Sequence, residues 1–177
     1  MDLINILVIL SAVIIIIILW FIVALRHLKI MLLAIRNQWE LSDRGLRRRQ
    51  NLLPNIIETL RKYDKTQEEF IETLIKIRIK AAKEYELGAK KIEYEHTLSH
   101  HINKIFGIAG TNNELLSDTN YLELKKEIGD LNHNIDLKAK KFNEMVRSFN
   151  KDLKRVYLKP IAFLKKYENI NIFEFEM

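Results

Sequence analysis

Hydrophobic residues form a continuous block at the start of the chain, from Leu3 to Leu25, and the block contains no charged residue. Its polar members are Asn5 and Ser11. As a helix rising about 1.5 Å per residue, the block is about 34 Å long and exceeds the bilayer hydrocarbon core, which is about 30 Å thick. Trp20 and Phe21 lie near one end, where aromatic rings favour the membrane interface. The pattern predicts a transmembrane helix, with the lipid bilayer as the partner of residues 3–25.

A cleaved signal peptide is the competing interpretation of this block. Such a peptide has a basic start, a shorter apolar core and small residues at a cleavage site. Here the start, Met1-Asp2, is acidic, and bulky Leu25-Arg26 follows a run that is too long. We therefore expect a retained anchor over residues 1–26 and a soluble domain over residues 27–177.

Beyond the anchor, apolar residues recur in steps of three and four, which is the spacing of one buried face of an α-helix. These stripes, the third of which continues the second, comprise Leu52, Ile56, Leu60 and Tyr63; Phe70, Leu74, Ile77, Ala81 and Tyr85; Leu98, Ile102, Ile105 and Ala109; and Leu124, Ile128, Leu131, Ile135, Ala139, Phe142, Val146, Phe149, Leu153 and Val156. No segment sustains the period of two that a half-buried strand requires. The soluble domain is therefore predicted to be helical.

Few residues interrupt this helical pattern. Asp64 or Thr66 is a candidate N-cap, because acidic residues follow in the next turn. Gly88 either interrupts the second helix or only weakens it. The segment Gly107–Asn120 is rich in Gly, Asn, Ser and Asp and is predicted to be the one clear loop.

The two prolines have different predicted effects. Pro54 lies inside a helical pattern, so we expect a bend there rather than a stop. Lys159-Pro160 should close the last long helix. Amphipathic helices joined by short links fold back on one another to bury their apolar faces. The sequence therefore predicts an all-α fold, in which one N-terminal transmembrane helix is followed by an antiparallel, up-and-down-like four-helix bundle of long helices.

Charge at the two ends of the apolar block predicts the orientation of the anchor. Only Asp2 precedes the block, whereas Arg26, Lys29 and Arg36 follow it. Basic residues near a span are retained in the cytoplasm. We therefore expect a single-pass protein of the cell (inner) membrane, with its N-terminus outside and its C-terminal domain in the cytoplasm.

A basic run follows further along the chain, at Arg44, Arg47, Arg48 and Arg49. Anionic lipid is the partner that a basic surface beside a membrane would meet first. A solvated helix face that also obeys the positive-inside rule is the alternative interpretation. Nucleic acid is not expected, because the aromatic residues lie in buried stripes rather than on a stacking surface.

Two motifs stand out in the soluble part of the chain. The first is Arg-Arg-Gln-Asn-Leu-Leu-Pro-Asn-Ile-Ile-Glu-Thr over residues 48–59, and the second is Phe142-Asn143-x-x-Val146-x-x-Phe149-Asn150. Both resemble motifs of the LemA family of membrane-anchored bacterial proteins. Further residues that match the family pattern are Trp39, Tyr63, Arg78, Ile161-Ala162 and Phe173-Glu174. The resemblance implies a short outside N-terminus, one span, a cytoplasmic four-helix domain and no established enzymatic activity.

The chain also departs from that family pattern. Thr66-Gln67 replaces a His-Glu pair, Asn112-Asn113 replaces Tyr-Pro, and Tyr157 replaces a proline. These differences identify a divergent member and leave the roles of the replaced residues undefined.

Candidate chemical sites are few. With no cysteine, the chain has no disulfide, thiolate metal site or cysteine nucleophile. Glu93, His96 and His100 have the helical spacing of a carboxylate-bridged di-metal site, but a second Glu-x-x-His is missing, and a polar face near a loop explains these residues equally well. No nucleophile elbow, phosphate loop or dinucleotide motif is present. The sequence therefore predicts no catalytic, cofactor or metal site.

Three asparagines in the motifs, Asn55, Asn143 and Asn150, need a separate explanation, because Asn is a poor helix-interior residue. Buried amides that pair across helices would fix their register, and a binding role is the alternative. We expect the stripe around Leu52–Ile57 to pack against Phe142, Val146 and Phe149, with these amides satisfied at the seam.

The function indicated by these features is that of a non-enzymatic, membrane-tethered scaffold or adaptor of the LemA type. Its helical domain would engage a protein partner, of unknown identity, at the cytoplasmic face of the membrane. A regulator or partner of a cell-envelope enzyme, such as a membrane protease, is the alternative. A metal-binding enzyme is the least favoured.

Overall fold

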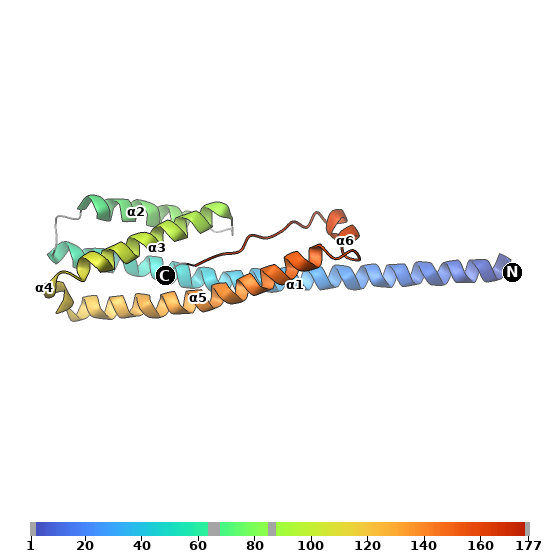
Figure 1. The fold of residues 1–177 in the computed structure, drawn as a ribbon, viewed down its shortest axis with the longest axis horizontal. Coiled ribbons are helices and arrows are strands. Elements are labelled where there is room, and N and C mark those ends of the chain that lie inside the picture. Colours follow the sequence, from blue (N-terminus) through green and yellow to red (C-terminus); the bar gives the residue numbers. More distant parts are fainter. Residues whose placement is uncertain (1–2, 64–67, 85–87, 176–177) are drawn as a thin grey trace. The chain divides into compact units, whose positions relative to one another are not determined.

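The computed structural model describes residues 3–63, 68–84 and 88–175, and the regular elements in these ranges are all helices (Figure 1). They are α1 (Leu3–Tyr63), α2 (Glu68–Lys83), α3 (Ala89–Ala109), α4 (Asn113–Leu116), α5 (Thr119–Leu153) and α6 (Lys159–Leu164). The all-α prediction is confirmed for the described residues.

Helix α1 is 61 residues long and continues from the apolar block into the first family motif. It contains an 18-residue window with a mean hydropathy of 3.5, none of which is buried. By length and composition this helix is a candidate to cross a membrane, in keeping with the expected anchor. Pro54 lies inside α1 and does not end it, as expected, while the bend stays a prediction.

The Gly88 position separates two helices rather than weakening one. Its backbone is extended (φ −159°, ψ 172°) and forms the N-cap of α3, while α2 ends at Lys83. The second and third stripes therefore belong to different helices, which pack against each other. The proposed caps Asp64 and Thr66, the pair Thr66-Gln67 and the stripe residue Tyr85 lie outside the described residues.

The predicted loop Gly107–Asn120 is shorter than expected and contains a helical turn. Helix α3 continues to Ala109, and Asn112 caps α4 by accepting the backbone N–H groups of Glu114 and Leu115 at 3.0 and 3.1 Å. Asp118 then accepts the backbone N–H of Tyr121 at 3.0 Å, in the first turn of α5. The polar residues that predicted a loop are thus largely helix caps.

The end of α5 was predicted wrongly. The helix stops at Leu153 instead of Lys159-Pro160, and Pro160 lies in the first turn of α6. Proline suits that position because its missing N–H would have no partner there. Val156, the last member of the predicted stripe, is accordingly 82% exposed.

The chain forms two compact units. Unit 1 comprises Met1–Arg36 and Glu144–Ile170, and unit 2 comprises Asn37–Asn143 and Asn171–Met177. The buried apolar residues of unit 1 are Ala24, Leu28, Ile35, Val146, Phe149, Leu158, Ile161 and Ala162.

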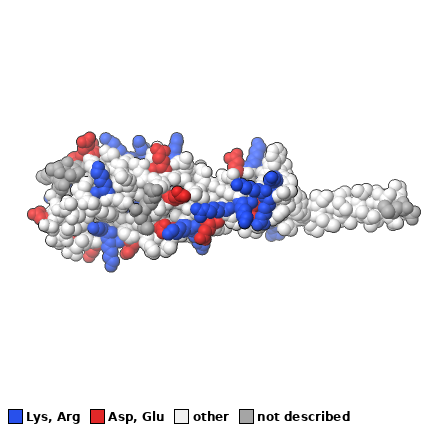
Figure 2. Space-filling model, in the orientation of Figure 1, with Lys and Arg blue, Asp and Glu red and all other residues white. Residues whose placement is uncertain are grey.

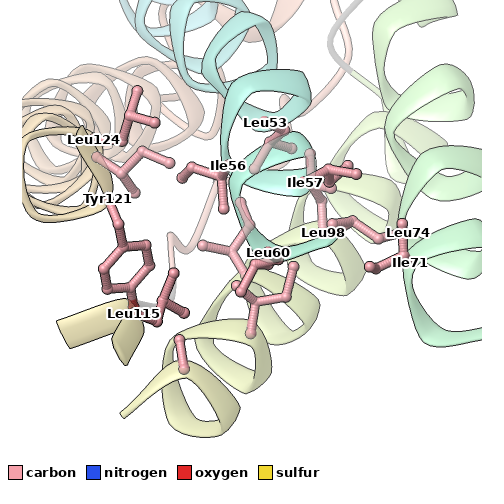
Figure 3. Close-up of a cluster of buried hydrophobic side chains, with 14 of the residues drawn as sticks. Leu53, Ile56, Ile57, Leu60, Ile71, Leu74, Leu98, Leu115, Tyr121 and Leu124 are labelled. Atoms are coloured by element: carbon pink, nitrogen blue, oxygen red, sulfur yellow. The ribbon is translucent and has the colours of Figure 1, made fainter. Parts of the chain in front are cut away.

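The core of unit 2 is formed by helices α1 to α5 (Figure 3). Leu53, Ile56 and Ile57 from the first motif share this core with Tyr121 and Leu124 from the start of α5. The other labelled members in Figure 3 are Leu60, Ile71, Leu74, Leu98 and Leu115. One helical face of the first motif therefore packs into the core of unit 2.

Within unit 2, α1 and α5 run antiparallel. Trp39 contacts Phe142, Arg48 donates to Glu127, and the Thr59 hydroxyl accepts a hydrogen bond from Asn120. Later residues of α1 therefore contact earlier residues of α5. This register corrects our expectation for Phe142, whose ring packs against Trp39 rather than the Leu52–Ile57 stretch. The antiparallel arrangement of all four long helices stays a prediction.

Candidate functional site

The clearest concentration of polar chemistry in unit 2 surrounds Arg49 of the first motif. This side chain is 1% exposed and projects from α1 into the bundle. Its Nη1 donates to Ser99 Oγ at 2.9 Å and Asn132 Oδ1 at 3.2 Å, and its Nη2 donates to Glu95 Oε2 at 3.1 Å. One guanidinium therefore links α1, α3 and α5.

Glu95 is the carboxylate at the centre of this network. Its second oxygen, Oε1, accepts hydrogen bonds from Gln50 Nε2 at 2.6 Å and lies 3.0 Å from Lys91 Nζ. Lys91 is itself 1% exposed; its Nζ also donates to the Ala81 carbonyl at 3.0 Å and lies 3.3 Å from Asp43 Oδ1. Two buried cations thus face two carboxylates, which offsets much of the penalty for burying each charge.

Burial and pairing act in opposite directions on Arg49. Desolvation lowers the pKa of the guanidinium, while the charge and hydrogen bonds of Glu95 raise it. The guanidinium carbon also lies 4.9 Å from the centre of the Phe175 ring, so an aromatic face covers this side of the cation. Arg49 is thus enclosed by protein groups.

A second polar contact in this region involves Arg78, half-buried on α2, whose Nε donates to the backbone carbonyl of Gln50 at 2.9 Å. In a regular helix that carbonyl would accept the N–H of the residue four positions later. That residue is Pro54, which has no N–H. Arg78 therefore supplies the donor that the proline of the motif lacks.

The second motif holds the C-terminal segment. In unit 2, Asn143 Nδ2 donates to the Phe173 carbonyl and Asn143 Oδ1 accepts the Phe173 N–H, both at 2.8 Å. Phe173 is buried against Trp39, with ring centroids 5.4 Å apart in an edge-to-face arrangement. One asparagine thus satisfies both backbone groups of an extended residue, as a neighbouring strand would.

The same arrangement recurs in unit 1, one motif step away. Asn150 Nδ2 donates to the Ile170 carbonyl at 2.8 Å, and Asn150 Oδ1 accepts the Ile170 N–H at 3.0 Å. Phe149 is fully buried, and its ring centroid lies 6.4 Å from that of Tyr167. Both Phe-Asn pairs of the second motif therefore combine a buried ring with an amide that binds backbone.

Comparison with known proteins agrees with both motifs. The family model described as the LemA family matches residues 38–177. The chain belongs to the LemA family. No curated protein matches it. The matched region begins one residue before Trp39 and contains Arg49, Arg78, Asn143 and Asn150, so the contacts above all lie inside the LemA-family region.

The basic run of this LemA-family chain is not one surface. Arg49 is buried and is unavailable to a lipid headgroup, which corrects our expectation for that residue. Arg44 and Arg48 are exposed, and Arg48 pairs with Glu127 at 2.8 Å. Arg47 is half-buried and donates to Asp43 at 2.6 Å. Lipid contact through Arg44, Arg47 and Arg48 stays a prediction.

The asparagine prediction is confirmed only in part. Asn143 and Asn150 are satisfied by backbone of the C-terminal segment, not by amides of a facing helix. Asn55 is exposed, so it does not lie at a seam. Its backbone carbonyl accepts the Thr59 hydroxyl at 2.9 Å, one helical turn later. A structural role therefore fits Asn143 and Asn150 but not the side chain of Asn55.

The Glu93, His96 and His100 set is not gathered into a metal site in the structure. Glu93 and His100 are exposed, and the described ranges contain no group of three or more His, Asp or Glu side chains that could hold a metal ion. Glu95 and Lys91, which the sequence analysis missed, are the buried charges of α3. The sequence does contain a sign of their burial. Glu95 lies three residues before Leu98 and Lys91 four residues before Glu95, so both charges continue the Leu98 stripe toward the start of α3.

Proposed function

We propose that this LemA-family chain is a non-enzymatic, membrane-tethered scaffold whose helical body engages a protein partner at the cytoplasmic face of the membrane. The observation that carries the proposal is the continuity of α1, in which the apolar block and the first motif share one 61-residue helix. A tether built as part of the body's own core helix keeps that body beside the membrane.

The enclosed charges of unit 2 support a non-enzymatic role. An acid or base must reach its substrate directly or through one water. Glu95 and Lys91 are each 1% exposed and are bonded to neighbouring protein groups.

The orientation has its own test. Arg26, Lys29 and Arg36 favour a cytoplasmic body by the positive-inside rule. A reporter that works only in the cytoplasm, fused after Met177, should be active, and replacing the three basic residues by Gln should reduce that activity. An export-dependent reporter that is active on the unaltered chain would reverse the assignment.

Photocrosslinking in intact cells tests the scaffold role. A photoreactive residue is placed at exposed apolar positions on the body, namely Leu41, Ile79, Leu122 and Leu137, and at buried Leu98 as a control. We expect one protein to be captured reproducibly from some exposed positions and not from Leu98. Replacing residues 3–25 by an unrelated apolar span should preserve capture, whereas deleting them should abolish it.

Two outcomes would contradict the scaffold proposal. One is equal capture by the chain that lacks its apolar block, because the tether would then be unnecessary. The other is the absence of a reproducible captured protein at every exposed position. Capture of a cell-envelope enzyme whose activity changes with this chain would favour the alternative, a regulator of that enzyme.

A further inference from the structure

The segment after α5 carries an unusual amount of exposed apolar surface. Phe163 is 88% exposed and Val156 is 82% exposed, the two largest values among the large hydrophobic residues in the part of the chain that the structure describes. Leu164 and Tyr157 are 63% and 50% exposed. Four such side chains within nine residues form one cluster in sequence, which we call the 156–164 segment.

This exposure does not come from a loose tail. Leu158 and Ile161 are 1% and 0% exposed and anchor the opposite side of the segment in unit 1. After α6, Lys166 adopts a left-handed conformation (φ 53°) and the Tyr167 N–H donates to the Ala162 carbonyl at 2.9 Å, which caps the helix. Buried residues therefore hold the segment in unit 1, while its other apolar side chains stay exposed.

The segment lies at the end of the apolar block of α1. His27 Nε2, two residues beyond Leu25, is 2.8 Å from Asp152 Oδ2, and Arg155 Nε is 3.0 Å from Asp152 Oδ1. Ala24 and Leu28, on either side of this level of α1, are buried. If residues 3–25 cross the bilayer, the turn after α5 lies where the span leaves the hydrocarbon.

Three basic side chains and one acidic side chain, that of Glu168, lie beside two of the exposed apolar ones. Lys154, Lys159 and Lys166 line an open groove of about 830 Å³ together with Phe163 and Leu164. Figure 2 shows Lys and Arg side chains gathered beside the uncharged N-terminal rod. Apolar side chains flanked by lysines are the composition of segments that lie in a bilayer interface with anionic headgroups.

We propose that the 156–164 segment docks on the leaflet from which α1 emerges, with Phe163 and Val156 inserted at the interface and Lys154, Lys159 and Lys166 binding anionic phospholipid headgroups. This inference rests on the proposed membrane anchor. Two attachments, one spanning and one interfacial, restrict the rotation and tilt of unit 1 in the bilayer. The proposed contact with anionic lipid therefore lies beside the transmembrane span.

A single labelled cysteine tests the docking, since the chain contains no cysteine of its own. The full chain is reconstituted with an environment-sensitive fluorophore at Phe163→Cys, at Ile14→Cys in the apolar block, or at Glu123→Cys on the exposed face of α5. Vesicles of phosphatidylcholine are compared with vesicles of phosphatidylcholine and phosphatidylglycerol. We expect the label at 163 to shift to the blue in anionic vesicles and to be quenched by shallow nitroxide lipids, and the label at 123 to do neither.

The label at Ile14→Cys separates failure of this inference from failure of the anchor. Deep quenching at 14 with a water-like label at 163 in both vesicles would overturn the docking alone, while a water-like label at 14 would overturn the anchor. A blue shift at 163 that persists in detergent and rises with protein concentration would show a second copy of the chain there, and would also overturn the docking.

A charge comparison tests the role of the lysines. Replacing Lys154, Lys159 and Lys166 by Gln should abolish the difference between neutral and anionic vesicles. Replacing three exposed lysines of the body, Lys80, Lys126 and Lys141, removes the same charge and should preserve that difference. Equal responses of the two triple variants would overturn headgroup binding by the groove lysines.

Discussion

Arg78 Nε lies 2.9 Å from the backbone carbonyl of Gln50, the carbonyl that Pro54 leaves without its usual helical donor. A side chain of α2 thus repairs the hydrogen-bond ladder of α1 at its one proline. This contact explains how α1 continues through Pro54 to Tyr63, and why an arginine on a separate helix belongs with the proline of the first motif.

The first prediction is an energetic coupling between Arg78 and Pro54. Arg78→Met should destabilise the protein by about 1–3 kcal/mol, because the Gln50 carbonyl loses its donor. Pro54→Ala restores a backbone N–H, so Arg78→Met should cost at least about 0.5 kcal/mol less in that background. Denaturant unfolding of the full chain in detergent, followed by circular dichroism, measures all four variants. Strictly additive effects would contradict the repair.

These contacts show where sequence reasoning stops. The helical stripes and the uncharged block were readable because burial repeats with the helical period. The contact of Arg78 could not be predicted, since the separation of 24 positions between Pro54 and Arg78 does not determine how their two helices pack. Glu95 and Lys91 could have been noticed as charges in stripe positions, but which groups they meet depends on how three helices pack.

The same limit explains the errors at Pro160 and Phe142. A proline both ends a helix and suits the first turn of a new one, so its position alone does not decide between these roles. Two apolar stripes pair equally well in several registers. Here the register is specified by close contacts such as Trp39 with Phe142 and by the ion network, which no hydrophobic pattern encodes.

The second prediction concerns the buried ion network. Glu95→Gln should destabilise the protein by about 3–5 kcal/mol, because it removes the carboxylate that pairs with buried Arg49 and leaves buried Lys91 with Asp43. Glu93→Gln makes the same chemical change two residues earlier at an exposed site and should alter stability by less than about 0.5 kcal/mol. Thermal melting of both variants provides the comparison, and similar melting temperatures would contradict the network.

The third prediction compares two glycines inside helices. A Cβ at Gly45 would lie 2.8 Å from Ile135 Cγ1, whereas a Cβ at Gly129 meets nothing within 4 Å. Gly45→Ala should therefore destabilise the protein by about 1–3 kcal/mol through overpacking. Gly129→Ala should stabilise it by about 0.5–1 kcal/mol through helix propensity. Opposite shifts in unfolding midpoint are expected, and stabilisation by Gly45→Ala would disprove the close approach.

The fourth prediction is a dependence of stability on pH. Hydrogen bonds from the Tyr121 N–H and the Tyr63 hydroxyl lower the pKa of Asp118. A carboxyl with a lowered folded pKa stabilises the protein above its unfolded pKa of about 3.9, and this contribution is lost as the pH falls through the folded pKa. Asp118→Asn should lower the melting temperature at neutral pH and flatten its decline in acid. Asp130→Asn, on the exposed side of α5, removes the same charge and should preserve the decline.

Tyr63 should make stability fall as the pH rises, which is opposite to the effect of Asp118. Its hydrogen bond to Asp118 raises the pKa of the phenol. Because the pKa of Tyr63 is higher in the folded protein, this hydrogen bond stabilises the fold fully below the unfolded pKa of tyrosine, about 10. The stabilisation is lost as the pH rises through the folded pKa. Tyr63→Phe should therefore remove an alkaline loss of stability that the native chain shows in melting experiments. An unchanged alkaline profile would contradict this hydrogen bond.

The last prediction concerns the amide that holds Phe173. Asn143→Leu deprives two buried backbone groups of their partners, so we expect a loss of about 1–3 kcal/mol for each group left unsatisfied. Asn143→Asp keeps the acceptor for the Phe173 N–H and removes the donor to its carbonyl, so its effect should be smaller than that of Asn143→Leu. Unfolding midpoints and protease cleavage near Phe173 provide the two readouts.

A binding role for Asn143 predicts a different result for the same variants. Melting and cleavage would stay as in the native chain, while photocapture of the partner would be lost, because the amide would act on another molecule rather than on Phe173. Asn55→Leu is the matched control, since Asn55 is exposed on α1 and its side chain should contribute little to stability. Faster cleavage near Phe173 in Asn143→Leu, but not in Asn55→Leu, is the outcome that the clamp requires; equal cleavage in the two variants would refute it.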